Sequence, residues 1–185
     1  MRTFIALEPP PELRTAVGEL NAALKSRLAN MKWVKPNLVH LTLRFLGEIE
    51  PGRIGALNQA VADAAGEIGS FELNVTEIGH FGSALNPRVL WLGLAASSNL
   101  SSLAAGLEAS LESAGFGRAD KPFRAHLTLA RAGRRPGPAM DWDAVAGATP
   151  PRWPHWSVGA ISVIKSTLTP SGPLYKTLSI HELTG

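Results

Sequence analysis

The tetrapeptide His-Leu-Thr-Leu occurs twice in this chain of 185 residues, at positions 40–43 and 126–129. In both places polar and apolar side chains alternate, which is the pattern of a β-strand. Residues two apart on a strand share a face, so each copy directs its His and Thr to one side and its two leucines to the other. Each copy is therefore expected to hold one imidazole and one hydroxyl in fixed positions on the same face of a strand.

His40 and His126 are the predicted catalytic pair. The pKa of an ordinary His lies near neutrality, so one imidazole can take a proton while a second gives one. The hydroxyls of Thr42 and Thr128 could donate hydrogen bonds to non-bridging phosphate oxygens. A single His beside a Thr is more often structural, but packing alone gives no reason to keep both residue types in both copies. Two histidines and two threonines together suit in-line displacement at phosphorus.

The amino-acid composition excludes several other kinds of site. The chain has no Cys, which excludes disulfides, thiolate zinc sites and a cysteine nucleophile. No HExxH pattern is present and no His has carboxylate neighbours at ligand spacing, so no metal and no cofactor are expected. The remaining three histidines have no partner at a recognisable spacing and are predicted to be surface or packing residues. No segment resembles a signal peptide or a membrane span, so we expect a soluble, cytoplasmic protein that needs no membrane and no obligate protein partner.

Much of the basic excess lies near the two motifs, although the formal net charge is only +3. Arg131, just after the second motif, is predicted to bind a substrate phosphate. Phe45 has the strand parity of Leu43, which predicts a packing role. The clustered cations favour a phosphate-bearing ligand. They are Lys32, Lys35 and Arg44 near the first motif, and Lys121, Arg124, Arg131, Arg134 and Arg135 near the second.

The elements around the motifs predict an α+β fold. Strands are expected at 2–7, 37–48, 71–79, 88–94, 125–131, 156–168 and 173–183. Helices are expected from Pro11 through Leu24, over 51–66, and from a cap at Ser98 or Asn99 to about Gly115. The Pro- and Gly-rich segment 133–154 is expected to be irregular. We expect residues 1–185 to form one domain of two interleaved lobes related by a pseudo-two-fold axis, because only that arrangement brings the motifs together.

The chain resembles the 2H phosphoesterase superfamily, and within it the RNA 2',3'-cyclic phosphodiesterases, also called 2'-5' RNA ligases. The segments that carry this resemblance are RTFIAL, VHLTLRFLGE, VLWLGL, KPFRAHLTLAR and STLTPSGPLYKTL. The resemblance implies two lobes of antiparallel sheet with outer helices around a central groove. It implies metal-free hydrolysis of a 2',3'-cyclic phosphate to a 2'-phosphate, with His40 as general acid and His126 as general base. Many relatives have Pro where this chain has Ala125.

The resemblance also implies an RNA substrate with a 2',3'-cyclic phosphate or a 2'-5' linkage, tRNA fragments included. Phe123, Trp33 and Tyr175 are candidates for base or ribose contacts, because aromatic faces and cations hold single-stranded RNA, although core packing would also explain them. Three alternatives stay open: 2'-5' RNA ligation by the same histidines, phosphodiesterase action on 2'-5' oligonucleotides or small cyclic nucleotides, and non-catalytic binding of RNA ends. No Lys-x-x-Gly or GxxxxGK sequence is present, so ATP is not expected.

Overall fold

The structure, a computed structural model, describes residues 1–133, 139–150, 152–170 and 172–185. Within these residues an eight-stranded antiparallel sheet has the order β10-β9-β1-β3-β7-β6-β5, and β2 also pairs with β7. Its strands are β1 (Arg2–Leu7), β2 (Met31–Trp33), β3 (Leu41–Glu48), β5 (Val75–Gly82), β6 (Pro87–Leu94), β7 (His126–Ala132), β9 (Ala160–Thr169) and β10 (Gly172–Glu182). A second sheet joins β4 (Phe71–Leu73) to β8 (Trp156–Val158).

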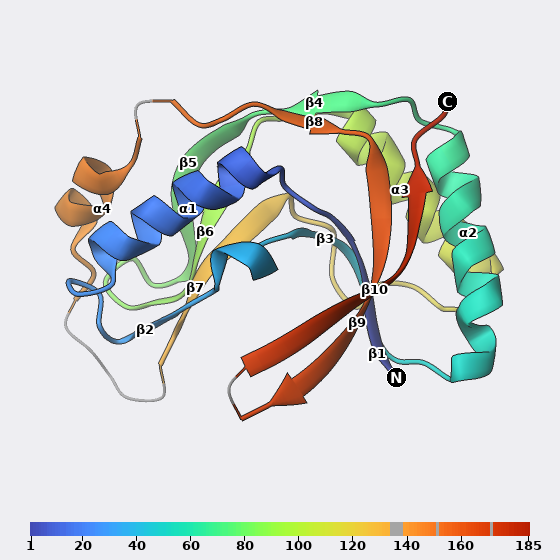
Figure 1. Cartoon of the computed structure of the whole chain (residues 1–185), viewed down its shortest axis with the longest axis horizontal. Helices are drawn as coiled ribbons and strands as arrows, with labels where there is room; N and C mark the ends of the chain where they lie inside the picture. Colours follow the sequence, from blue (N-terminus) through green and yellow to red (C-terminus); the bar gives the residue numbers. More distant parts are fainter. Residues whose placement is uncertain (134–138, 151, 171) are drawn as a thin grey trace.

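The helices cover the two halves of the sheet in pairs. They are α1 (Pro11–Leu24), α2 (Ile54–Gly66), α3 (Ser98–Ser113) and α4 (Trp142–Ala148), with short 3₁₀ turns at η1 (Pro36–Leu38) and η2 (Pro51–Arg53). Helices α1 and α4 lie beside β5, β6 and β7, whereas α2 and α3 lie on the side of β9 and β10 (Figure 1). Helix α1 follows β1 in the chain but lies with the opposite half, so the two halves are interleaved.

The predicted helices α1 and α3 are present, and their ends have local causes. Pro11 opens α1, where a missing N–H is tolerated, and its apolar side chains at three- and four-residue spacing are buried. The cap of α3 is Ser97, one residue earlier than the earlier of the two predicted caps, and its hydroxyl accepts from the Leu100 N–H at 3.2 Å. The chain leaves α3 through Gly115, whose positive φ of 78° suits glycine.

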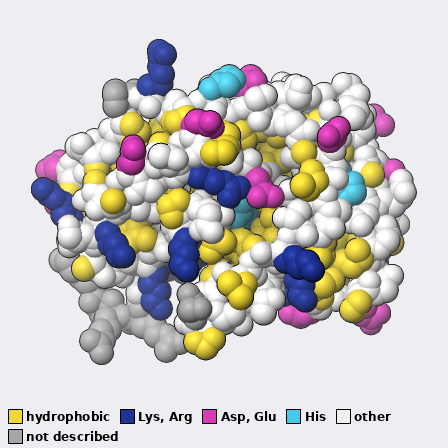
Figure 2. Space-filling view, in the orientation of Figure 1, with side chains coloured by type: hydrophobic (Ala, Val, Ile, Leu, Met, Phe, Trp, Pro, Cys, Tyr) yellow, Lys and Arg dark blue, Asp and Glu magenta, His cyan; other side chains and the backbone are white. Residues whose placement is uncertain are grey.

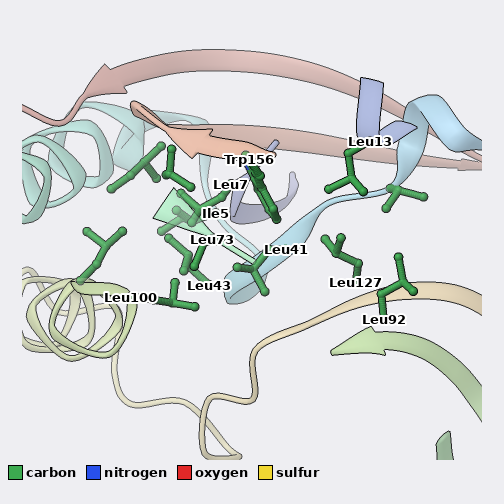
Figure 3. Close-up of a cluster of buried hydrophobic side chains, with 14 of the residues drawn as sticks. Ile5, Leu7, Leu13, Leu41, Leu43, Leu73, Leu92, Leu100, Leu127 and Trp156 are labelled. Atoms are coloured by element: carbon green, nitrogen blue, oxygen red, sulfur yellow. The ribbon is translucent and has the colours of Figure 1, made fainter. Parts of the chain in front are cut away.

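The two motifs meet at the centre of the large sheet. Strands β3 and β7 pair antiparallel with Leu41 opposite Leu127, the second residue of each motif. Leu41, Leu127 and Leu129 are fully buried and Leu43 nearly so, and the core they enter continues into both halves (Figure 3). The predicted α+β arrangement and the burial of the motif leucines are confirmed.

Two predicted strands are broken where the chain passes from one sheet to the other. The segment 71–79 splits at Asn74 into β4 and β5, and the segment 156–168 splits at Gly159 into β8 and β9. The small sheet of β4 and β8 buries Phe71 and Trp156 against the main core. The apolar pattern of the segments 71–79 and 156–168 predicted strands, but it did not show that each segment contributes a strand to both sheets.

Two further predictions need correction, and one strand was not predicted. Strand β3 begins at Leu41 and not at residue 37, because Pro36 opens a 3₁₀ turn. The segment 133–154 is not wholly irregular: it contains α4, where the Asp141 carboxylate accepts from the Ala144 N–H at 2.8 Å. Strand β2 was not predicted, since its three residues are too few to show a period.

A β-bulge in β3 reverses the alternation that the sequence suggested. Ala6 of β1 is opposite Thr42, but Ile5 is opposite Arg44, so Leu43 is an extra residue on β3. Beyond the bulge Arg44 is only 6% exposed and Phe45 is 48% exposed. The predicted packing role of Phe45 is therefore wrong, because strict alternation holds only while the register is unbroken.

Burial of Arg44 is offset by strong hydrogen bonds. Its Nη1 donates to both carboxylate oxygens of Glu108 at 2.7 Å, and its Nη2 donates to the Gly117 carbonyl at 3.0 Å. Glu108 also accepts from the Ala119 N–H at 2.6 Å. The pair ties β3 to α3 and to the loop after it. Arg44 is therefore unavailable to a ligand, and the prediction that grouped it with the phosphate-binding cations is wrong.

We expect Arg44→Ala to lower the free energy of unfolding by about 2–3 kcal/mol, because it leaves a partly buried carboxylate without its charged hydrogen-bond partner. Urea unfolding followed by circular dichroism measures this change. Arg118→Ala is the matched control, since Arg118 pairs with Glu112 of the same helix but is 78% exposed. A similar shift in unfolding midpoint for both variants would contradict a special role for the Arg44 pair.

Candidate active site

The two motif histidines are held in the same way. The Nδ1 atom of His40 lies 2.8 Å from the Leu38 carbonyl oxygen, and that of His126 lies 2.7 Å from the Arg124 carbonyl oxygen. A carbonyl oxygen can only accept, so Nδ1 carries the proton in both neutral rings. Each Nε2 is then left with a free lone pair. The carbonyl belongs in both cases to the residue two positions earlier, so the equivalence of the motifs extends to the imidazole tautomer.

Aromatic rings surround both histidines. The ring centroid of His40 is 4.7 Å from that of Phe4 and 5.4 Å from that of Tyr175. The ring of His126 is 5.1 Å from Phe81 and 6.4 Å from Trp91. These neighbours come from strands β1, β5, β6 and β10, which lie far from the motifs in the sequence. Of the four, only Tyr175 was a predicted site residue, as a candidate for base or ribose contacts, and none was predicted as a neighbour of a histidine, because sequence spacing does not reveal neighbours across a sheet.

Burial lowers the pKa of His40 and of His126 below the ordinary value of 6.5, because it disfavours the charged imidazolium. The hydrogen bond to the carbonyl oxygen acts in the opposite direction in both cases. The positive charge of Arg131 lowers the pKa of both histidines further. Arg131 is therefore electrostatically coupled to the two motifs at once, and both histidines are predominantly neutral at pH 7.

A groove of about 790 Å³ opens on the sheet face that carries the motif polar side chains. Figure 2 shows a recessed His near the middle of one face, with a basic and an acidic side chain directly beside it and further Lys and Arg side chains at a greater distance. The lining includes His40, Thr42 and Thr128, whereas His126 is not among the described residues that line it. The other lining residues are Arg2, Phe4, Lys32, Trp33, Val34, Lys35, Leu38, Phe45, Arg131, Ser166, Leu168, Pro170, Gly172, Pro173 and Tyr175.

The charge of the groove is entirely positive among the described residues that line it. Lys32 lies directly opposite Arg131 in the pairing of β2 with β7, a like-charge contact that disfavours the bare sheet. Lys35 and Arg2 add two more cations. An anionic ligand would relieve the repulsion between them. Arg134 and Arg135, predicted to belong to the same basic cluster, lie outside the described residues.

The predicted aromatic contacts occupy two different places. Trp33 and Tyr175 line the groove. Phe123 is half-buried, packs against the main hydrophobic core and is not among the described lining residues. Burial raises the pKa of the Tyr175 phenol, so its hydroxyl stays protonated at neutral pH. The groove therefore offers aromatic surface near His40 and beside Lys32 of β2.

The other three histidines lie outside this groove. His80 packs on Trp142 at 5.2 Å, His155 contacts Glu72 at 2.6 Å, and the Nε2 of His181 lies 3.0 Å from the hydroxyl of Ser179. Each of them has a structural contact, as predicted. Over the described residues, no three His, Asp or Glu side chains gather as metal ligands would. No helix in the described ranges is long and apolar enough to span a bilayer.

Comparison with known proteins identifies the family. The model of the family described as "LigT like Phosphoesterase" matches residues 7–91 and again residues 92–175, once around each motif. An RNA 2',3'-cyclic phosphodiesterase of Archaeoglobus fulgidus is 31% identical over 98% of this chain and 100% of its own. One from Thermotoga maritima is 32% identical over 96% of this chain and 93% of its own.

Solved structures agree with this assignment. The crystal structure of TT0787 of Thermus thermophilus superposes with a TM-score of 0.82 at 29% identity, covering 100% of this chain and 99% of that one. E. coli LigT in apo form superposes with a TM-score of 0.75 at 24% identity over 100% and 98% of the chains, which supports the fold. The chain belongs to the LigT-like phosphoesterases of the 2H superfamily.

Proposed function

We propose that this protein hydrolyses the 2',3'-cyclic phosphate at RNA ends, the activity that the names of its relatives give for them, and that the product is a 2'-phosphate. The observation that carries the proposal is the equivalence of His40 and His126. Each holds its Nδ1 proton on a backbone carbonyl and leaves Nε2 free, next to a Thr of its own motif. In a pair of this kind one histidine can take a proton from the attacking water, and the other can give a proton to the leaving oxygen.

The reaction requires one proton transfer at each end of an in-line displacement. The base, His126, takes a proton from water while the water oxygen bonds to phosphorus. The bond from phosphorus to the 3' oxygen breaks, and the acid, His40, gives its proton to that oxygen. The product carries its phosphate on the 2' oxygen. The acid and base roles follow the family resemblance, since the two motifs are identical in sequence.

Thr42, Thr128 and Arg131 are proposed to stabilise the charge that builds up on the phosphate oxygens. Both Thr residues line the groove together with His40. Hydroxyl donors and a guanidinium placed where charge develops lower the barrier most effectively when they are fixed in advance. Replacement of water by a 5'-hydroxyl would give a 2'-5' linkage through the same displacement, so ligation needs no further residue.

RNA fragments with cyclic phosphate ends, tRNA fragments among them, are the proposed substrates, and we place the reaction in the cytoplasm. The positive groove suits a polyanion, and its aromatic lining suits unpaired bases. We further propose that residues 1–185 act as one domain. The pairing of β3 with β7 supports this, because it makes one sheet from the strands that carry both motifs.

We expect His40→Ala and His126→Ala each to reduce kcat by about a hundredfold or more, because general acid and general base catalysis each contribute that much. The assay is hydrolysis of an oligoribonucleotide with a 2',3'-cyclic phosphate, in EDTA and without ATP, with the product isomer identified. His155→Ala, which removes an exposed His outside the groove, is the control. Retained binding without turnover by the wild type would instead identify a module that binds RNA ends.

The pH dependence should be bell-shaped, because one His must be neutral and the other protonated. For the free enzyme both pKa values lie below 6.5, so we expect kcat/KM to peak on the acidic side of pH 6.5 and to fall above it as the acid loses its proton. The anionic substrate favours imidazolium, so kcat should peak at a higher pH than kcat/KM. A kcat/KM profile that is flat between about pH 5 and 8 would contradict the mechanism.

Arg131→Gln should change the pH profile as well as the rate. Removal of its charge raises the pKa of both histidines, so the kcat/KM maximum should move to higher pH. The maximal rate should fall about tenfold or more, because a phosphate contact is lost. Lys35→Gln is the control: it removes a groove cation that does not shift either His, so the position of its profile should not move. Identical profiles for both variants would argue against coupling through Arg131.

A further inference from the structure

The sheet face that carries the motif polar side chains continues past His126 onto β6 and β5. Gly93 of β6 is opposite His126, and Trp91 lies two residues before Gly93 on the same strand. Trp91 is in turn opposite Gly79 of β5, and Phe81 lies two residues beyond Gly79. Cross-strand partners and residues two apart share a face, so Phe81 and Trp91 lie on the face of His126. Neither ring is among the described residues that line the groove.

Two glycines make room for an aromatic surface beside His126. A Cβ atom on Gly79 would overlap the indole of Trp91, and one on Gly93 would come within 3.1 Å of it. The indole therefore occupies the space that side chains at these two positions would fill. Trp91 is half-buried, and its ring centroid is 6.4 Å from that of His126. A ligand that reaches His126 from this side meets an aromatic ring that lies close to the backbone of the sheet.

Phe81 and Arg124 lie next to this surface without closing on each other. The ring of Phe81 is 5.1 Å from that of His126, at an interplanar angle of 83°. The guanidinium carbon of Arg124 is 6.0 Å from the Phe81 centroid. In the closed contact between Arg53 and Phe116 the same distance is 4.1 Å. A planar base held between two planar groups needs roughly 7–8 Å, twice the contact distance between carbon atoms, so Phe81 and Arg124 are already partly separated.

Arg124 can move over a ligand at this place. Its side chain is exposed, and no Asp or Glu within the described ranges forms a salt bridge with it. Its backbone carbonyl accepts the Nδ1 proton of His126, so the residue that carries this cation also orients the imidazole. We refer to Phe81 and Arg124 as the open pair.

The geometry of in-line displacement decides which molecule meets the open pair. The attacking oxygen enters opposite the leaving 3' oxygen, and in the proposed mechanism it passes its proton to His126 while His40 serves the leaving oxygen. A water molecule needs no contact beyond His126. A 5'-hydroxyl, by contrast, brings a whole nucleotide to the side of His126, where Trp91 and the open pair are the exposed or half-buried groups on the same face.

We propose that Phe81 and Arg124 form an acceptor subsite, which binds the nucleotide that supplies the 5'-hydroxyl in 2'-5' ligation and holds its base between the ring and the guanidinium. This inference rests on the proposed function. The 5' oxygen bonds to phosphorus, and its proton goes to Nε2 of His126. The bond from phosphorus to the 3' oxygen breaks, its electron pair stays on that oxygen, and His40 gives a proton to it. The chemistry of ligation needs no residue beyond those of hydrolysis, but the acceptor needs a place to bind.

The test lets water and an acceptor compete for one donor in the same reaction. The donor is a triadenylate with a 2',3'-cyclic phosphate and a blocked 5' end, and the acceptor is a triadenylate with a 5'-hydroxyl and a blocked 3' end. The ratio of 2'-5' linked product to 2'-phosphate product is measured from initial rates at a fixed acceptor concentration. Both products need the same donor and the same two histidines, so the ratio reports only how the attacking group is bound.

Phe81→Leu should lower this product ratio about tenfold, because it removes the stacking of one base, whereas Phe81→Tyr should preserve the ratio. Arg124→Gln should lower it as well. Arg118→Gln is the matched control for the charge: Arg118 belongs to the same loop, is 78% exposed and pairs with Glu112, so its loss should leave the ratio as it is in the wild type. With an acceptor whose first nucleotide lacks its base, the wild type and Phe81→Leu should give the same ratio.

The two products separate failure of the acceptor subsite from failure of the proposed function. A purely structural role of Phe81 beside His126 would lower both products together in Phe81→Leu and leave their ratio unchanged, which would overturn the subsite. Hydrolysis of the cyclic phosphate by the wild type without any 2'-5' linked product would overturn it too, while the phosphodiesterase would stand. Absence of both products with the wild type would refute the phosphodiesterase and the subsite together.

Discussion

The pairing of β3 with β7 at Leu41 and Leu127 is the constraint on which the site depends. Both leucines are fully buried, so the two strands can meet only with these side chains toward the core. Because successive residues on a strand point to opposite sides, burial of the leucines assigns His and Thr to the other face. The interleaved helices then hold both halves of the sheet against one core (Figure 1). The reactive groups are thus positioned by apolar burial on the far side of the same strands.

That placement also sets the chemistry of the imidazoles. Rings from four other strands of the sheet lie against the histidines, and burial lowers both pKa values. In each neutral ring Nδ1–H donates to a backbone carbonyl, so the unprotonated Nε2 points in a fixed direction. A His exposed to water on the surface would not be held in one orientation. An anionic substrate restores part of the affinity for a proton. The groove therefore couples binding of the phosphate to the protonation state that its reaction needs.

The sequence was sufficient for the features that depend on local periodicity. The helices α1 and α3, the buried motif leucines and the pairing of His with Thr all follow from spacing along one element. The features it did not predict depend on register between strands. The bulge at Leu43 inverted the expected positions of Arg44 and Phe45, and the aromatic neighbours of the histidines lie on strands distant in the chain. Hydrophobic alternation carries no signal for an inserted residue, so Phe45 could not be placed in the groove beforehand.

Two identical motifs in a symmetric sheet must still act differently, because the reaction needs one acid and one base. Burial lowers the pKa of both histidines, but the charges around them differ. The carboxylate of Glu8 acts to raise the pKa of His40 and Arg14 acts to lower it, whereas Arg124 acts to lower the pKa of His126. None of these three residues belongs to a motif, so the two histidines are surrounded by different charges. Since the repeated residues are the same, the difference between the two roles has to come from side chains outside the repeat.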